Sequence, residues 1–281
     1  MKKIYILMAT YNGEKYLREQ IDSLLSQSYQ NWQLIIHDDN SKDNTVNIIK
    51  EYINNNIDKI KLINDDVSAG GAKENFTYLL KNIDKNYDYI MFCDQDDVWS
   101  EKKIELTLNK MIEVEQNNAN KSILIHTDLE VVNDKLETIS DSMFMYQKLN
   151  LSNQYSLTKI SMENIITGCT MMLNKHLVVK IKDIPREAIM HDWWIAIITL
   201  KENGIIEFLD NSTIKYRQHE FNTIGSKEVN YSYYLKKLPK IKEIISKYKR
   251  IYFQYRKANV NINIVNFIFM KSLMIVKKTL R

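Results

Sequence analysis

Short apolar runs alternate with longer amphipathic segments through the first hundred residues. The apolar runs have the length of buried β-strands, and the segments between them repeat Leu, Ile and Tyr at helical spacing. This alternation predicts right-handed βαβ units, a mostly parallel sheet and thus an α/β fold class. Strands are expected at 4–9, 32–39, 59–64 and 87–94, and helices at 14–28, from Ser41 to about Ile53, and at 73–83.

Beyond position 100 the pattern is less regular. It predicts a helix at 101–117, a strand at 123–132, a helix at 189–200 and two short strands around 205–216. The stretch 133–163 gives little signal. The tail from about 230 is expected to be helical and to end in an apolar segment, 264–276.

Composition bounds the class of protein and its compartment. With 281 residues, of which 44% are hydrophobic and 26% charged, the chain is typical of a globular protein with one large domain and an appendage. Cys93 and Cys169 lie in apolar stretches outside any CxxC pair, which indicates buried thiols in a reducing compartment. The apolar run after Lys2 and Lys3 is shorter than that of a signal peptide. We therefore expect a cytoplasmic protein.

Charge is distributed unevenly. From position 236 onward 13 Lys and Arg residues accompany one acid, Glu243, whereas the first 235 residues hold 26 bases and 34 acids. The tail interleaves these bases with Leu, Ile and Tyr, as in a basic amphipathic helix, and the segment 264–276 is too short to span a bilayer. We expect 236–281 to bind an anionic membrane surface, with about 1 kcal/mol from each basic residue near the lipid. Helices packed on the domain, or a homodimer contact, are the alternatives.

Polar residues directly follow three of the predicted strands. They are Thr10 and Tyr11 after the first strand, Asp38 and Asp39 at the end of the second, and Asp94, Asp96 and Asp97 after the fourth. In open α/β sheets ligands bind beyond the carboxyl ends of the strands. We expect these side chains to line one crevice.

The sequence CDQDDVW (93–99) places three acids within four positions. Such carboxylates repel one another unless a cation offsets their charge. Asp94 and Asp96 can both bind one octahedral ion, and carboxylate oxygens favour Mg²⁺ or Mn²⁺. An acidic turn that caps the next helix is the alternative for an isolated DxD. The position after a buried strand, aligned with two other polar strand ends, favours the metal site.

Neighbouring residues offer groups for a nucleotide. A carboxylate of the pair Asp38 and Asp39 can accept a hydrogen bond from a pyrimidine N3–H, although Asp/Asn/Ser clusters also make turns and caps. Tyr11 offers a ring on which a base can stack. Lys73 lies at the start of a predicted helix, where the helix dipole also favours a phosphate.

The sequence HDWW (191–194) combines an acid with two tryptophans at a predicted helix start. Asp192 is either the helix N-cap or a general base in an apolar pocket that accepts the proton of a sugar hydroxyl. The tryptophans are either core residues or, for one of them, a surface that packs on a sugar ring. His219, in YRQH (216–219), is more often an ordinary histidine than a metal ligand.

The sequences ATYNGEKYL, HDDNSKDNT and CDQDDVW, in this order, resemble the motifs of the inverting family 2 glycosyltransferases of the GT-A fold. With TGCTMML, MHDWW and YRQH added, the chain is most similar to the rhamnosyltransferase-type members that build bacterial surface polysaccharides. The resemblance extends from Lys3 to about Lys278. It implies a Rossmann-like, mostly parallel sheet flanked by helices. Residues 1–100 would be the nucleotide-sugar-binding half and 101–228 the acceptor-binding half of one GT-A domain, with 229–281 as a C-terminal extension of basic amphipathic helices.

The resemblance also implies roles for individual residues. Asp192 would be the catalytic base. The nucleotide would contact Thr10, Tyr11, Asp39, Asp94 and, from its helix, Lys73; the metal would contact Asp94, Asp96 and His219; the acceptor would contact Trp99, His191 and Trp193.

The implied reaction is a single in-line displacement with Mn²⁺ or Mg²⁺ as cofactor. Subgroup resemblance implies L-rhamnose from dTDP-rhamnose as the donor sugar, and a lipid-linked or polysaccharide acceptor in cell-surface glycan synthesis. A UDP-hexose transferase of the same fold, for glucose, galactose or GlcNAc, is the alternative, since thymine and uracil both present an N3–H. A non-catalytic nucleotide-sugar-binding module is the alternative of another class. Nucleic acid is not expected as a partner because acids line the crevice.

Overall fold

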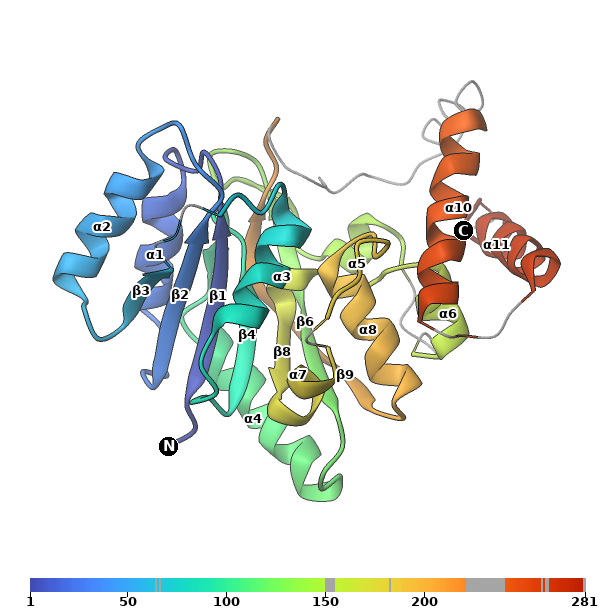
Figure 1. The fold of residues 1–281 in the computed structure, drawn as a ribbon, viewed down its shortest axis with the longest axis horizontal. Coiled ribbons are helices and arrows are strands. Elements are labelled where there is room, and N and C mark those ends of the chain that lie inside the picture. The colour runs from blue at the N-terminus through green and yellow to red at the C-terminus, as the bar shows by residue number, and fades with distance from the viewer. Residues whose placement is uncertain are drawn as a thin grey trace.

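The computed structural model describes residues 1–279 except 64, 66, 150–154, 182, 221–240, 259 and 261–262. The described chain forms a curled α/β sheet flanked by helices, with two further helices at its C-terminal end (Figure 1). The α/β fold class predicted from the sequence is confirmed.

Nine strands in the described residues form one sheet. They are β1 Ile4–Thr10, β2 Trp32–Asp38, β3 Ile60–Ile63, β4 Tyr89–Cys93, β5 Val98–Trp99, β6 Ile123–Val132, β7 Thr138–Ser140, β8 Met171–Asn174 and β9 Ile205–Arg217. Neighbours follow the order β3-β2-β1-β4-β8-β6-β9-β5, and β7 pairs with β6. The first four strands in this order are parallel, β8 is antiparallel to β4 and β6, and β9 is parallel to β6. One sheet therefore joins the two predicted halves.

Helices cover both faces of this sheet. They are α1 Leu17–Leu25, α2 Thr45–Asn55, α3 Ala72–Asn82, α4 Lys103–Asn117, α5 Met143–Tyr146, α6 Leu157–Met162, the short 3₁₀ helix η1 Gly168–Thr170, α7 Lys175–Lys180, α8 His191–Lys201, α10 Ile241–Lys257 and α11 Ile264–Thr279. One hydrophobic cluster packs α1, α2 and α4 on the sheet, and a second packs α3, α7 and α8. Strand β1 is apolar from Ile4 to Ala9 because both of its faces are covered: Ile4 and Ile6 enter the first cluster while Tyr5 and Leu7 enter the second.

Residues 205–217 form one strand, so the prediction of two short strands around 205–216 is wrong. The polar residues Asp210, Asn211 and Ser212 lie within this strand. Thr127 pairs with Leu209 and Asp128 with Ser212, so the residues between bulge out of the ladder. Bulges of this kind bend a strand without ending it. As a result β9 continues to Arg217, beside the acids that follow β4.

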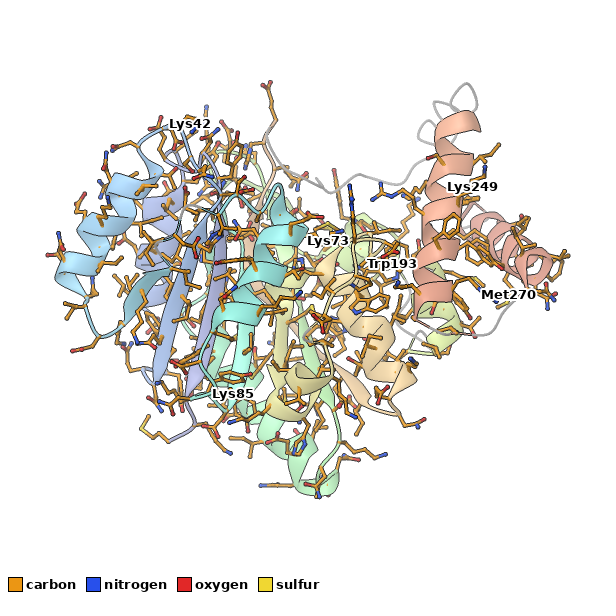
Figure 2. The ribbon with its side chains drawn as sticks, viewed as in Figure 1. Lys42, Lys73, Lys85, Trp193, Lys249 and Met270 are labelled. Carbon is orange, nitrogen blue, oxygen red and sulfur yellow. The ribbon has the colours of Figure 1, made fainter. Side chains whose placement is uncertain are left out.

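The helices α10 and α11 lie at one end of the molecule, and α10 packs against α6 there (Figure 1). Figure 2 shows Lys249 and Met270 on these helices, on the opposite side of the molecule from Lys42. Gln254 of α10 accepts a hydrogen bond from the backbone N–H of Ile189 at 2.7 Å, which joins α10 to the segment before α8. A helical tail is confirmed for most of 241–279, whereas residues 229–240 of the predicted extension lie outside the described residues. Within the described part of the chain no helix has both the length and the apolarity to cross a bilayer.

Candidate active site

The polar ends of β1, β2 and β4 meet at one edge of the sheet, as predicted. Thr10 Oγ1 donates a hydrogen bond to Asp38 Oδ1 at 2.7 Å, and the backbone N–H of Asp39 donates to the Thr10 carbonyl at 2.9 Å. On the other side of β1, the Gln95 side chain bonds the backbone of Tyr11. The residues that follow the three strands therefore form one connected surface.

The two acids after β2 have different local roles. Asp38 accepts from the backbone N–H of Ser41 at 2.8 Å and from its hydroxyl at 2.6 Å, which forms a side-chain turn. Asp39 accepts from the backbone N–H of Ala69 at 2.7 Å and of Gly71 at 2.9 Å, and Gly70 bonds both of its oxygens. Asp39 thus fixes the loop that enters α3.

Hydrogen bonding keeps Asp39 ionised. Burial acts to raise the pKa of its carboxyl, but the hydrogen bonds from Gly70, Ser68, Gly71 and Ala69 outweigh burial and hold that pKa below its usual value. Gly70 and Gly71 have φ of 86° and 143°, conformations that favour glycine, and this accounts for the paired glycines. The contact of Asp39 with a nucleobase stays a prediction.

The acids after β4 crowd one another. Burial, followed by the charges of Asp96 and Asp192, raises the pKa of Asp94 to about 7. Asp97 is fully buried, and burial followed by the charges of Asp96 and Asp94 raises its pKa well above the usual range. Its Oδ2 has no hydrogen-bond partner among the described residues. At neutral pH such carboxyls are either protonated or neutralised by a cation.

The residues fit a divalent cation. Ligand atoms of Asp94, Asp97 and Cys169 lie within 4.8 Å of one another, close enough to surround one ion. Asp96 Oδ2 lies 2.8 Å from His219 Nε2. The structure thus brings the predicted ligands Asp96 and His219 together and adds Asp97 and Cys169 beside Asp94. Carboxylate oxygens suit Mg²⁺ or Mn²⁺. The role of each residue as a ligand stays a prediction.

Arg217, at the end of β9, holds this acidic loop from one side. The residue is 1% exposed, its Nε donates to the Asp96 carbonyl at 2.9 Å, and its backbone N–H donates to Asp97 Oδ1 at 3.2 Å. The guanidinium lies 4.3 Å from the ring centroid of Tyr16, and the His219 ring lies 4.9 Å from the same ring. The YRQH sequence therefore supports the loop through its arginine as well as its histidine.

Asp192 lies in the first turn of α8 and is 8% exposed. Its Oδ2 accepts from the backbone N–H of Gly168 at 3.1 Å, and its Oδ1 accepts from that of Trp193. The N-cap of α8 is Met190, so the alternative that made Asp192 the cap is wrong. Burial raises the pKa of Asp192 to about 6, against the opposing hydrogen bonds from Trp193 and Gly168. Its charge in turn raises the pKa of Asp94, so the two carboxylates share one site.

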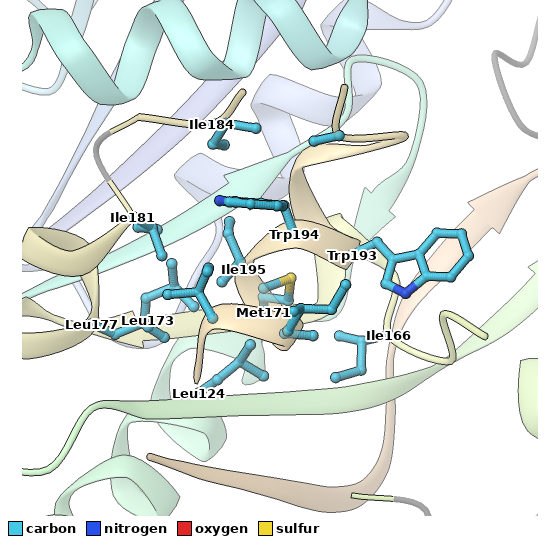
Figure 3. Close-up of a cluster of buried hydrophobic side chains, with 14 of the residues drawn as sticks. Leu124, Ile166, Met171, Leu173, Leu177, Ile181, Ile184, Trp193, Trp194 and Ile195 are labelled. Carbon is cyan, nitrogen blue, oxygen red and sulfur yellow. The ribbon is translucent and has the colours of Figure 1, made fainter. Parts of the chain in front are cut away.

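The predicted acceptor residues are buried. Trp193 and Trp194 are each 6% exposed, and their rings point to opposite sides of the start of α8 (Figure 3). His191 packs 4.3 Å from the Phe76 ring centroid, burial lowers its pKa to about 3, and neither ring nitrogen has a hydrogen-bond partner among the described residues. Trp99 is 2% exposed. The contact of His191, Trp193 and Trp99 with an acceptor stays a prediction.

Lys73 joins α3 to the segment before α8. Its ammonium donates to the carbonyls of Arg186 at 2.8 Å and Ala188 at 2.9 Å, and it pairs with Glu74 at 2.9 Å. Three protein partners therefore engage the group that was predicted to reach a phosphate. The phosphate contact stays a prediction.

Four residues of the site were overlooked in the sequence: Gln95, Gly168, Cys169 and Arg217. Gly168 shows most clearly why its type is needed. A Cβ at this position would lie 2.7 Å from His191 Nε2, and the glycine N–H bonds Asp192. A signal was available, because one of only six glycines stands next to one of two cysteines inside an apolar segment.

A curled, mostly parallel sheet with helices on both faces is the fold of a GT-A glycosyltransferase. The model of glycosyl transferase family 2 matches residues 5–177, which is more than half of the chain. The chain belongs to this family.

Curated relatives include proteins named as sugar transferases. The chain is 29% identical over 222 residues to the dTDP-rhamnosyl transferase RfbG of Shigella flexneri, a match that covers 78% of this chain and 74% of the relative. It is 26% identical over 208 residues to the UDP-Glc:alpha-D-GlcNAc-diphosphoundecaprenol beta-1,3-glucosyltransferase WfgD of Escherichia coli, covering 72% and 71%.

Solved structures agree on the fold. TarS 1-349 of S. aureus in complex with UDP-GlcNAc matches with a TM-score of 0.57 and 21% identity, over 81% of this chain and 62% of that one. The mannosyltransferase PcManGT from Pyrobaculum calidifontis, in complex with GDP-Man and Mn2+, matches with a TM-score of 0.57 and 12% identity, over 93% and 65%. The chain thus spans less than two thirds of these neighbours, and it shares their fold.

Proposed function

We propose that this chain is an inverting, metal-dependent glycosyltransferase that moves L-rhamnose from dTDP-rhamnose to a hydroxyl of a lipid-linked or polysaccharide acceptor. The observation that supports catalysis most strongly is the buried carboxylate of Asp192, whose pKa is raised to about 6 and whose charge acts on Asp94. General bases with pKa values near the working pH are effective proton acceptors. A binding module would have no need of such a group.

The residues suggest how the transfer proceeds. Asp192 takes the proton of the acceptor hydroxyl while the hydroxyl oxygen bonds the anomeric carbon and the bond from that carbon to the diphosphate breaks. The N–H groups of Gly168 and Trp193 orient the carboxylate. A divalent cation held by Asp94 and Asp96 would offset the charge that develops on the leaving diphosphate. One displacement inverts the configuration, so β-linked dTDP-rhamnose gives an α-linkage.

The choice of sugar is supported by the relative named as a dTDP-rhamnosyl transferase. The relative named as a UDP-glucose enzyme supports UDP-glucose as the second candidate. Nothing in Asp39 or Tyr11 separates thymine from uracil, because both bases present the same N3–H and a ring for stacking.

A donor panel tests the proposal. Purified protein is assayed for hydrolysis and transfer with dTDP-rhamnose, UDP-glucose, UDP-galactose and UDP-GlcNAc, each with Mn²⁺ or Mg²⁺ and after chelation. We expect metal-dependent turnover of dTDP-rhamnose that disappears in Asp96→Ala and falls about 10²- to 10⁴-fold in Asp192→Asn, the usual contribution of a general base. The exposed Asp210 provides the matched control, since Asp210→Asn should retain activity.

Each other outcome of the panel has a definite meaning. Turnover of a UDP-sugar with none of dTDP-rhamnose would replace the rhamnose assignment by the UDP-hexose alternative. Turnover that survives chelation would refute metal dependence. A metal-dependent thermal shift with a nucleotide but no turnover of any donor would leave the non-catalytic nucleotide-sugar-binding module as the remaining interpretation. If neither turnover nor a thermal shift is seen with any of the nucleotides, both interpretations are refuted.

The proposal includes attachment to the inner face of the cell membrane through α10 and α11. The outer side of α11 exposes Ile264, Val265, Ile268, Phe269 and Leu273. Lys271, which interrupts the apolar segment in sequence, instead points to the body of the molecule and donates to the Met162 carbonyl at 2.6 Å. Lys247, Lys249 and Arg250 are exposed on α10. An apolar stripe on one helix and exposed basic residues on the other suit an anionic lipid surface.

A deletion tests the attachment. A chain that ends before residue 264 should leave the membrane fraction, and unchanged partitioning would refute the idea. If the stripe is instead a homodimer contact, the deletion should convert a dimer into a monomer without changing membrane partitioning.

A further inference from the structure

Gln95 makes an unusual pair of hydrogen bonds to one distant residue. Its Oε1 accepts from the backbone N–H of Tyr11 at 2.9 Å, and its Nε2 donates to the Tyr11 carbonyl at 2.9 Å. Only this orientation of the side-chain amide satisfies both backbone groups. The side chain thus acts as a peptide unit of a neighbouring strand. Since β1 and β4 are paired up to Met8 and Cys93, Gln95 continues that pairing beyond the last paired residues.

The chain around Tyr11 is shaped to admit this amide. A Cβ at position 13 would lie 2.4 Å from Gln95 Oε1 and 2.6 Å from its Cδ, so only glycine leaves room. Gly13 is held in place by its N–H, which donates to Thr45 Oγ1 at 2.7 Å. The next residue back, Asn12, has a φ of 47°, so the backbone turns sharply after Tyr11. Gly13 and Gln95 therefore form a matched pair.

Both backbone groups of Tyr11 are engaged by Gln95, while the residue as a whole is 55% exposed. A large aromatic side chain that is exposed on a fixed backbone can present its ring to a ligand at little conformational cost. Gln95 itself stands between Asp94 and Asp96. A single side chain consequently joins the exposed ring to the acidic loop.

We propose that Gln95 is a positioning residue, which sets the ring of Tyr11 relative to the acids so that the base and the diphosphate of the donor are bound in one fixed arrangement. The inference rests on the proposed function, because it requires that a nucleoside diphosphate binds at this edge of the sheet. It assigns to the middle residue of the DQD sequence a role in recognition of the base, although Gln95 contacts neither the base nor the metal. If Gln95 only stabilised the acidic loop, it would affect the positions of Asp94 and Asp96 and not the ring of Tyr11.

Two probes separate these roles: dTDP, which has a base, and inorganic pyrophosphate, which has none. Both are titrated calorimetrically into the full chain with Mn²⁺ present, and UDP replaces dTDP if the donor panel selects a UDP-sugar. We expect Gln95→Met, which keeps the length of the side chain but removes both hydrogen bonds, to weaken dTDP about 10-fold, the scale of one aromatic stacking contact. Pyrophosphate affinity should stay within about 2-fold of wild type, since the acids are retained.

A double-mutant cycle tests whether Gln95 acts through the ring. Tyr11→Ala should weaken dTDP by itself, and adding Gln95→Met to Tyr11→Ala should change the affinity by less than about 2-fold, since coupled residues are not additive. If Gln95→Met folds poorly, Gly13→Ala takes its place. The added methyl group displaces the Gln95 amide from the other side and should weaken dTDP to the same extent. The control is Gln33→Met, which removes a hydrogen bond to the Asp58 carbonyl at the opposite end of the sheet. It should leave dTDP affinity unchanged.

The inference is overturned if Gln95→Met weakens pyrophosphate as much as dTDP, if it leaves dTDP unaffected, or if its effect adds in full to that of Tyr11→Ala. If the wild-type chain binds neither dTDP nor UDP, the proposed function fails first and the inference fails with it. The two failures are distinguishable, because failure of the proposed function is seen with the wild-type chain alone, whereas failure of the inference is seen only when the variants are compared with it.

Discussion

The backbone N–H of Gly168 lies 3.1 Å from Asp192 Oδ2, and the same glycine leaves no room for a Cβ beside His191. Two segments more than twenty residues apart thereby fit together at the buried carboxylate. The close approach places Cys169 next to Asp94 and Asp97, so the TGC sequence contacts both the candidate base and the acidic loop. Gly168 is the residue whose replacement should disturb Asp192 without removing any charged group.

We expect Gly168→Ala to lower the rate of transfer by about 10- to 100-fold. The added methyl group must push away His191 Nε2, which would lie 2.7 Å from it, and this moves the first turn of α8. Misplacement of a catalytic group by about 1 Å has an effect of this size. Overpacking should also destabilise the fold by about 1–3 kcal/mol. Initial rates and chemical denaturation measure the two effects.

Gly204 offers a control with similar crowding away from the site. A Cβ there would lie 2.5 Å from the Ser122 carbonyl oxygen, so Gly204→Ala should also lower stability. Its activity per folded molecule should be that of wild type. Equal losses of activity in the two variants would mean that general destabilisation, and not the position of Asp192, explains the loss in Gly168→Ala.

The acid limb of the pH profile should reflect Asp192. Its pKa is raised to about 6 because burial disfavours the charged form, and only the deprotonated form can accept a proton. We therefore expect kcat/KM to rise with pH and to reach half of its plateau near pH 6. The residual activity of Asp192→Asn should show no such limb. An identical limb in both enzymes would assign the titration to another group.

Ionisation of Asp192 should lower the stability of the fold as pH rises, whereas it should increase kcat/KM. Since the folded-state pKa of Asp192 lies above the ordinary value of 3.8, its contribution to stability is fully present below pH 3.8 and is lost as pH rises through about 6. Without metal, Asp192→Asn should therefore be more stable than wild type at pH 8, by at most about 3 kcal/mol, and the difference should shrink toward pH 4. Denaturation at several pH values measures this, and a difference independent of pH would contradict it.

Hydrophobic periodicity sufficed to predict the longer elements of the first 132 residues. The helix predicted at 101–117 is observed as α4 Lys103–Asn117, and the strand predicted at 123–132 is β6 Ile123–Val132. The convergence of Thr10, Asp38 and Asp94 followed from parallel strand order alone. Such features depend on local patterns and on the direction of the chain, both of which are visible in one sequence.

Contacts between distant segments were not predictable in the same way. The sequence gives no sign that Gln95 bonds Tyr11 or that Arg217 bonds the Asp96 carbonyl, because each pair lies far apart along the chain and forms only through tertiary packing. The continuity of β9 through its polar residues 210–212 was not predictable because a bulge and a turn use the same residue types. Burial of His191 also escaped notice, since histidine is equally at home on a surface.

We expect His219 to influence the metal through Asp96. His219→Ala should raise the Mn²⁺ concentration for half-maximal activity by about 10-fold, because the group that orients Asp96 Oδ2 at 2.8 Å is lost. Activity measured across Mn²⁺ concentrations gives this value. His176, exposed on α7, is the matched control, and His176→Ala should leave the requirement for Mn²⁺ unchanged. The same Mn²⁺ requirement in both variants would remove His219 from the metal site.

The outer side of α11 should decide whether the chain binds lipid. Val265 and Phe269, 70% and 66% exposed, lie four residues apart and thus on one side of the helix, whereas Phe267 packs 5.4 Å from the Tyr252 ring centroid. Replacing Val265 and Phe269 by Ser should preserve the fold and weaken binding to vesicles that contain anionic phospholipid by at least about 10-fold, since each buried side chain contributes about 1.5–3 kcal/mol. Ile139→Ser, on exposed β7, is the control and should bind like wild type.

Binding to these vesicles should also weaken as the salt concentration rises, because salt screens the charges of the basic residues of α10. If the double variant still binds vesicles but changes from dimer to monomer in sedimentation, the stripe is a contact between two copies of the chain, and the lysines of α10 alone face the membrane.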